Sequence, residues 1–291
     1  MEVVPGQTEP DTRVVSRTMT TVTPDGRTLA YCCWGDPEGS PVFWLHGTPG
    51  SRLHHWAGDG YQRHGLRVVT YDRPGYGLST RQPGRRVVDV AADVRAVADA
   101  LGLGTFGVAG VSGGAGPALA CGARIPDRAV RCLGIVGSAP YLAMGDAFFD
   151  GMGQEAEDGY KHAVEGAESL ERDWREVEEW IDAGLPGLDD PGVLLRALEE
   201  GRRQGGGGFV DDNLADVADW GFALEEVGVP TRWLLAAQDP SVPLAHGDWL
   251  RRHLPGVEIV VTDGDHYGPS RDVEMDLLVW AARGSGKARR A

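Results

Sequence analysis

The chain has 291 residues, of which 42% are hydrophobic and 24% are charged, and its formal net charge is −15. This is enough apolar sequence for a sizeable core. No window approaches about 18 uninterrupted apolar residues, so we expect neither a transmembrane helix nor a membrane partner. The chain also lacks the basic footprint that phosphate binding requires, so we expect no nucleic-acid partner.

The acidic residues are concentrated in one part of the chain. Residues 141–230 hold 23 Asp and Glu against 6 Lys and Arg, whereas the remainder holds 20 against 22. We interpret this acidity as the solvated faces of helices. The alternative is that it attracts a neutral or cationic substrate.

The N-terminal residues and the cysteines indicate the cellular compartment in which the protein is expected. Residues 1–16 lack the basic start and apolar centre of a secretion signal, and we expect them to form a flexible arm. The four cysteines match neither a metal spacing nor a small disulfide framework, so we expect reduced structural thiols in a cytoplasmic protein. The histidines show no metal-ligand spacing either, and we expect no metal and no cofactor.

Strand and helix patterns alternate through the first half of the chain. Residues 17–22 and 28–34 predict two strands joined by a hairpin turn at Pro24-Asp25-Gly26. The spacing of apolar residues over 87–101 predicts an amphipathic helix. Further buried strands are predicted at 41–45, 67–71, 105–111 and 129–136. This alternation indicates an α/β fold with a largely parallel sheet that is covered on both faces.

The alternation stops at residues 141–226, which we interpret as an inserted helical cap. Within it, the glycines at 205–208 predict a flexible joint before a helix over 211–220. The sheet resumes later, and a last helix precedes a small basic tail. These later elements are strands at 231–235 and 257–261, a helix at 272–282, and a flexible tail at 283–291.

Gly110-Val-Ser112-Gly-Gly114 has the G-x-S-x-G pattern of a nucleophile elbow. It follows a predicted strand and precedes a segment of small residues that can form a helix, which is the context that this motif requires. Glycines suit such a tight turn because strand and helix approach each other closely there. A serine hydroxyl is a weak nucleophile by itself, so Ser112 needs a general base and an orienting acid.

Candidates for both partners follow later predicted strands. Asp239 follows the strand at 231–235, and His266 follows the strand at 257–261. Parallel α/β sheets keep their sites at the carboxyl ends of the strands, and the order Ser, Asp, His is that of α/β-hydrolases. We predict that His266 accepts the proton of Ser112 and that Asp239 orients the imidazole. Asp146 and Asp265 are rival acids, and His46 is interpreted as a structural residue of its loop.

Five segments together resemble the α/β-hydrolase superfamily, in its cap-bearing branch of esterases, proline iminopeptidases and carbon–carbon bond hydrolases. They occur in the family's order over about residues 20–282: His46-Gly-Thr-Pro-Gly50, Asp72-Arg-Pro-Gly-Tyr-Gly-Leu-Ser79, Gly110-Val-Ser-Gly-Gly114, Asp239-Pro-Ser-Val-Pro243 and Gly264-Asp-His266. The resemblance implies an eight-stranded, mostly parallel sheet. Residues 17–140 and 227–282 would form the core, and residues 141–226 the cap.

The resemblance also implies an oxyanion hole formed by the backbone N–H groups of Thr48 and Gly113. Tyr141, Met144 and Phe148, just beyond a buried strand, are predicted substrate contacts. Thr48 stands where related iminopeptidases have a second glycine of the loop, which counts against peptidase activity.

We therefore expect a small-molecule substrate and a metal-independent serine hydrolase that cleaves a small ester or related acyl compound through an acyl-enzyme. Alternatives on the same triad are a proline iminopeptidase-like aminopeptidase and a carbon–carbon bond hydrolase. A non-catalytic receptor with this fold is a further alternative, which the full set of triad candidates disfavours.

Overall fold

The computed structural model describes residues 17–55, 59–188, 191–268 and 270–287. The predicted N-terminal arm lies outside the described residues. No helix among the described residues has both the length and the apolar character needed to cross a membrane.

Among the described residues, eight strands of the sheet lie side by side in the order β1-β2-β4-β3-β5-β6-β7-β8, and a ninth, β9, pairs with β5 off this path. The two pairs that involve β2 are antiparallel and the other pairs along this path are parallel. The sheet is therefore mostly parallel, as predicted. The strands are β1 Met19–Val22, β2 Thr28–Gly35, β3 Ser40–Leu45, β4 Leu66–Tyr71, β5 Leu103–Val111, β6 Ala129–Ile135, β7 Thr231–Ala236 and β8 Glu258–Thr262. Within the predicted tail at 283–291, β9 (Gly286–Lys287) pairs antiparallel with the start of β5.

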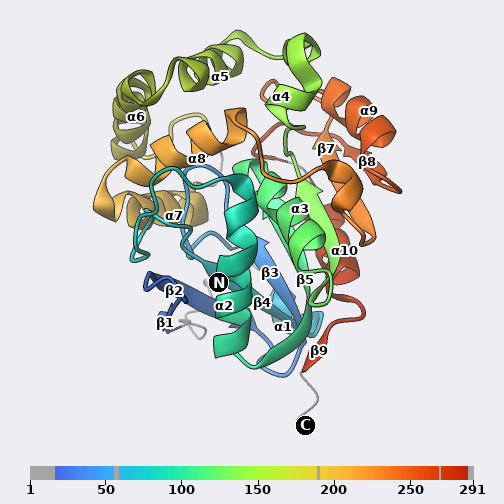
Figure 1. Cartoon of the computed structure of the whole chain (residues 1–291). Helices are drawn as coiled ribbons and strands as arrows, with labels where there is room; N and C mark the ends of the chain where they lie inside the picture. The colour runs from blue at the N-terminus through green and yellow to red at the C-terminus, as the bar shows by residue number, and fades with distance from the viewer. Residues whose placement is uncertain (1–16, 56–58, 189–190, 269, 288–291) are drawn as a thin grey trace, which may run out of the picture.

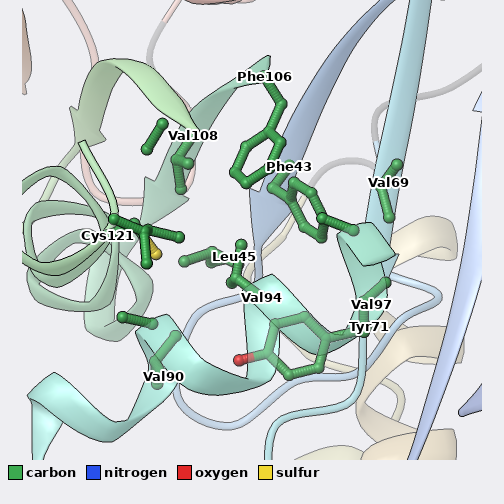
Figure 2. Packing of buried hydrophobic residues seen from close by; sticks show 14 of the residues in the cluster. Phe43, Leu45, Val69, Tyr71, Val90, Val94, Val97, Phe106, Val108 and Cys121 are labelled. Atoms are coloured by element: carbon green, nitrogen blue, oxygen red, sulfur yellow. The ribbon is translucent and has the colours of Figure 1, made fainter. Parts of the chain in front are cut away.

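Helices cover both faces of the sheet, because successive side chains of each strand point to opposite faces. From β3, Phe43 and Leu45 pack towards α2 and α3, as Figure 2 shows for that cluster. Val42 and Trp44 pack towards α1 and α10 on the other face. The helices of the two faces are α1 Gly60–Arg63, η1 Val87–Asp89, α2 Val90–Ala100, α3 Ala115–Arg124, α9 Leu244–His253 and α10 Arg271–Ala282.

Between β6 and β7 the chain forms a run of helices, here called the inserted helices. In Figure 1, α5 and α6 lie together at one end of the molecule, with α8 between them and the rest of the fold. These helices bury an apolar cluster of their own around Leu170, Trp174 and Phe209. The elements are α4 Tyr141–Met144, η3 Gly145–Phe149, α5 Gln154–Glu165, α6 Ala167–Asp182, α7 Gly192–Gly201, η4 Arg202–Gln204, α8 Gly207–Val217 and η5 Leu224–Glu226.

The prediction of a flexible joint at residues 205–208 is wrong. Gly207 and Gly208 lie in the first turn of α8. A Cβ atom on Gly206 would lie 2.5 Å from the ring of Trp174, and one on Gly208 would lie 2.9 Å from the backbone of Gly75. These glycines therefore let the start of α8 pack closely against its neighbours, a use of glycine that composition alone does not distinguish from flexibility.

Candidate active site

Ser112 lies at the sharp turn between β5 and α3. Its φ angle is 51°, in the left-handed region that a residue with a side chain rarely adopts. A Cβ atom on Gly110 would overlap the carbonyl oxygen of Gly114, and one on Gly114 would overlap that of Leu45. The glycines around Ser112 are therefore required, because strand and helix meet at backbone contact distance.

The loops after β7 and β8 bring Asp239 and His266 to Ser112. Nε2 of His266 lies 3.0 Å from Oγ of Ser112, and Nδ1 of His266 lies 2.8 Å from Oδ2 of Asp239. A carboxylate next to Nδ1 stabilises the tautomer with its proton on that nitrogen, which leaves Nε2 free to accept the serine proton. The three side chains predicted to meet thus lie in one chain of contacts. Their catalytic roles remain predictions.

The rival acids lie elsewhere. Asp146 is exposed on η3, and the carboxylate of the exposed Asp265 accepts the backbone N–H of Tyr267 at 2.9 Å. The side chain of Asp239, in contrast, has no exposed surface. Burial beside the imidazole makes Asp239 the acid that this geometry supports.

Thr48 and Gly113, the predicted oxyanion donors, are neighbours in space. A Cβ atom on Gly113 would overlap Oγ1 of Thr48 and lie 3.5 Å from its backbone nitrogen. A Cβ atom on Gly47 would lie 3.4 Å from Cβ of Ser112. The loop after β3 therefore contacts the elbow directly, with the Gly113 amide in the first helical turn after Ser112, where N–H groups lack intrahelical partners.

His46 holds this loop, as predicted. The backbone N–H of Arg73 donates to Nε2 of His46 at 3.2 Å, so Nδ1 carries the proton and donates to the carbonyl of Gly47 at 2.7 Å. Burial away from water lowers the pKa of His46 well below its usual value. A neutral ring with both nitrogens occupied in this way is a structural residue and not a proton carrier.

The predicted substrate contacts lie in a buried aromatic cluster. The rings of Tyr141, Phe149, Tyr160 and His246 surround that of Phe148. Phe148 has no exposed surface, so its side chain cannot contact a substrate in this arrangement. Met144 is 8% exposed and Tyr141 is partly exposed. The cluster therefore serves packing first, and of the three predicted substrate contacts Tyr141 has the most surface to offer a ligand.

One face of α8 contacts the site, which the sequence interpretation missed. Asp212 accepts a hydrogen bond from the hydroxyl of Thr48 at 3.0 Å. One turn later, Asp216 accepts the hydroxyl of Tyr160 at 3.1 Å. Beyond the end of the helix, the ring of Trp220 would lie 2.9 Å from a Cβ atom on Gly116, just after the elbow. The available signal was the four-residue spacing of these three residues, which favours one helical face.

Asp216 is a half-buried carboxylate one turn after Asp212 on α8. Loss of hydration raises its pKa to about 6, and the negative charge of Asp212 adds to the effect. Among the described residues, no Lys or Arg forms an ion pair with it. This face of α8 therefore carries an acidic group that a cationic ligand would stabilise in its charged form.

Within the described ranges, no cluster of three or more His, Cys, Asp or Glu side chains has a geometry that could hold a metal ion. The chemistry that the arrangement supports is proton transfer and nucleophilic attack by side chains.

Comparison with known proteins shows what this chain resembles. A family model described as alpha/beta hydrolase fold matches residues 40–161. A non-heme chloroperoxidase from Streptomyces lividans is 31% identical over 149 residues, 50% of this chain and 54% of that protein. A bifunctional esterase/perhydrolase from Acinetobacter calcoaceticus is 28% identical over 233 residues, 76% of this chain and 82% of that protein. The chain thus aligns with about half the length of the chloroperoxidase and most of the esterase/perhydrolase.

Two further similarities concern a part of the sequence and the whole fold. A proline iminopeptidase from Xylella fastidiosa is 33% identical over 107 residues, 36% of this chain and 34% of that protein. The crystal structure of an enol-lactonase from Burkholderia xenovorans superposes with a TM-score of 0.68 at 21% identity, over 90% of this chain and 99% of that one. At this identity the superposition shows the fold alone.

Proposed function

Because this chain belongs to the α/β-hydrolase superfamily and is a hydrolase with esterase and peptidase homologues, we propose that it is a serine hydrolase of small esters or related acyl compounds. The observation that carries the proposal is the chain of contacts from Ser112 through His266 to Asp239. The proposal also includes the division of the chain into a core, residues 17–140 and 227–282, and a cap, residues 141–226.

The geometry supports a mechanism of two acyl transfers. As Oγ of Ser112 bonds to the acyl carbon, its proton passes to Nε2 of His266 and the carbonyl π electrons move to oxygen. When the bond to the leaving group breaks, the imidazolium donates that proton to the departing oxygen. Water then attacks the acyl-enzyme, gives its proton to His266 and releases the acid, while Oγ regains the proton.

Thr48 and Gly113 would stabilise the oxyanion that forms in each step. Their backbone N–H groups lie on the loop and the helical turn that meet beside Ser112, so both can face the same developing charge. One such donor typically contributes about 3 kcal/mol of transition-state stabilisation.

A fluorophosphonate probe tests the nucleophile. We expect it to label the wild-type protein and the Ser241→Ala variant, and we expect Ser112→Ala to abolish both labelling and hydrolysis of p-nitrophenyl acetate. Ser241 is a suitable control because it lies in the loop of Asp239 and contributes only its backbone N–H there. Persistent labelling of Ser112→Ala would refute the assignment.

Asp216 favours a second candidate, an aminopeptidase on the same triad. A desolvated carboxylate one helical turn after Asp212, which contacts Thr48, is a group that would bind the ammonium of an aminoacyl substrate, and one relative is named a proline iminopeptidase. In that case Asp216→Asn would lower kcat/KM for aminoacyl arylamides and leave neutral p-nitrophenyl esters nearly unaffected. A wild-type protein that cleaves no arylamide in a panel of aminoacyl groups would exclude this candidate.

A further inference from the structure

We propose that Asp212, on the inserted helix α8, is a positioning residue for the oxyanion hole and acts by holding Thr48. The inference rests on the serine-hydrolase function proposed above. It assigns to the inserted helices a part in the chemical step, besides any part in binding a substrate.

The carboxylate of Asp212 lies at the centre of a hydrogen-bonded cluster. Its Oδ2 atom accepts the hydroxyl of Thr48 at 3.0 Å, the hydroxyl of Tyr76 at 2.9 Å and the guanidinium of Arg73 at 2.5 Å. Its Oδ1 atom accepts Arg85 at 2.6 Å. Thr48 is therefore bonded to a carboxylate that three other side chains of the core, Arg73, Tyr76 and Arg85, also hold in place.

Thr48 is fixed on two sides. Its hydroxyl donates to Asp212 and accepts from Arg73 at 3.0 Å, which uses the proton and a lone pair. On its other side lies Gly113, which has no room for a side chain there. Since an oxyanion donor has to lie about 3 Å from the developing charge, fixing this side chain also fixes the backbone N–H of the same residue.

Arg73 links the carboxylate to the rest of the loop. The guanidinium is fully buried and donates to the carbonyls of His46 and Gly47. A buried guanidinium requires a counter-charge, and Asp212 supplies it from α8. Burial by itself would raise the pKa of Asp212, but the charges and hydrogen bonds of Arg73 and Arg85 outweigh it and lower the pKa, so the carboxylate is charged at neutral pH. Loss of this charge would therefore loosen the same loop at its backbone as well as at Thr48.

Asp211 is a matched control on the same helix. Its buried carboxylate accepts Arg81 at 2.8 Å and Arg85 at 3.3 Å, and these bonds do not include Thr48. Asp211→Asn removes the same charge from the next residue and weakens the attachment of α8 to the core. A difference between the two Asn variants thus reports on the contact with Thr48 and Arg73 rather than on attachment.

The test measures kcat and KM for a p-nitrophenyl ester, together with thermal unfolding. We expect Asp212→Asn and Thr48→Val to lower kcat by about 10- to 100-fold, less than the loss of a whole donor, with KM within about 2-fold. Thr48→Val removes the hydroxyl but keeps the β-branched shape and the backbone N–H. Thr48→Ser, which restores the hydroxyl, should recover most of the lost kcat. The double variant should be no slower than the slower single one, since both act through one contact.

Asp211→Asn should lower the unfolding temperature about as much as Asp212→Asn while its kcat stays near that of the wild type. Equal kcat in the two Asn variants, or a wild-type kcat in Thr48→Val, would overturn the inference. Thr48→Val decides the matter even if Asp212→Asn does not fold. If Ser112→Ala abolishes hydrolysis but Asp211→Asn and Asp212→Asn have the same kcat, the serine-hydrolase function is retained and only the role of Asp212 is refuted. Full activity of Ser112→Ala would remove the proposed function itself.

Discussion

The two carboxylate oxygens of Asp239 have different partners. Oδ2 lies 2.8 Å from Nδ1 of His266, whereas Oδ1 accepts the backbone N–H groups of Ser241 and Val242 at 2.7 and 3.0 Å. The loop after β7 thus anchors one oxygen so that the other faces the imidazole. This leaves the side chain no freedom to turn away from His266.

Asp239→Asn should impair catalysis and preserve the fold. With its oxygen bound to the two loop amides, the amide nitrogen would face Nδ1 of His266 and favour the tautomer with the proton on Nε2. That tautomer cannot accept the proton of Ser112, so we expect kcat to fall by about 10³- to 10⁴-fold with KM little changed. Steady-state kinetics on a p-nitrophenyl ester check this. The exposed Asp265→Asn serves as the control, and a comparable loss there would contradict the assignment of Asp239.

Gly110→Ala should destabilise the protein. The added methyl group would overlap the carbonyl of Gly114, which is backbone and cannot move without opening the elbow. We expect a loss of roughly 3 kcal/mol in the free energy of unfolding, or failure to fold. Gly159→Ala is the matched control within α5, because a Cβ atom there meets nothing within 4 Å. It should raise stability by up to about 1 kcal/mol. Equal effects of both variants in urea denaturation would contradict the steric argument.

Glu274 should make stability fall as pH rises. Burial raises its pKa from 4.5 to about 8, so between these values the unfolded chain has lost a proton that the folded chain keeps. Its contribution is fully present below about pH 4.5 and is lost as pH rises through about 8. Glu274→Gln should remove this dependence and be the more stable protein above that range, by an amount on the order of a few kcal/mol. Thermal unfolding across the range checks this, with the exposed Asp272→Asn expected to follow the wild type. Parallel curves for wild type and Glu274→Gln would show that the prediction is wrong.

The titration of His246 should make stability fall as pH falls, the opposite of the effect of Glu274. Its Nδ1 accepts the N–H of Ala139 at 3.0 Å and its Nε2 donates to the carbonyl of Phe148 at 2.9 Å. Burial lowers its pKa from 6.5 to about 4, so its contribution is present above about pH 6.5 and is lost as pH falls through about 4.

His246→Leu should therefore destabilise the protein at neutral pH. It leaves two buried backbone groups unpaired, at a cost of about 1–3 kcal/mol each. Urea denaturation near pH 7 measures the loss, and the exposed His64→Gln is the control. If His246→Leu is as stable as that control, the two hydrogen bonds contribute nothing.

The sequence by itself was sufficient for the sheet and for the meeting of Ser112, Asp239 and His266. Strand patterns are local, and the carboxyl ends of neighbouring parallel strands lie at one edge, so residues that follow β5, β7 and β8 come together. The glycines of the elbow are equally local, because their role is set within a few residues of the turn. Helices whose apolar residues are less regularly spaced were harder to predict. The sequence analysis did not predict α5 or α9 as individual helices.

Only the tertiary structure decided which inserted residues face the site. Asp212 and Thr48 are 164 residues apart in the sequence but are joined by a hydrogen bond. Phe148 is buried by aromatic rings from separate segments of the chain. Periodicity marks one face of α8 but not what that face contacts, because the contact depends on how the helix crosses the loops of the core. That placement follows from many long-range contacts at once, including the close approach of Gly208 to Gly75. No single stretch of sequence contains this information.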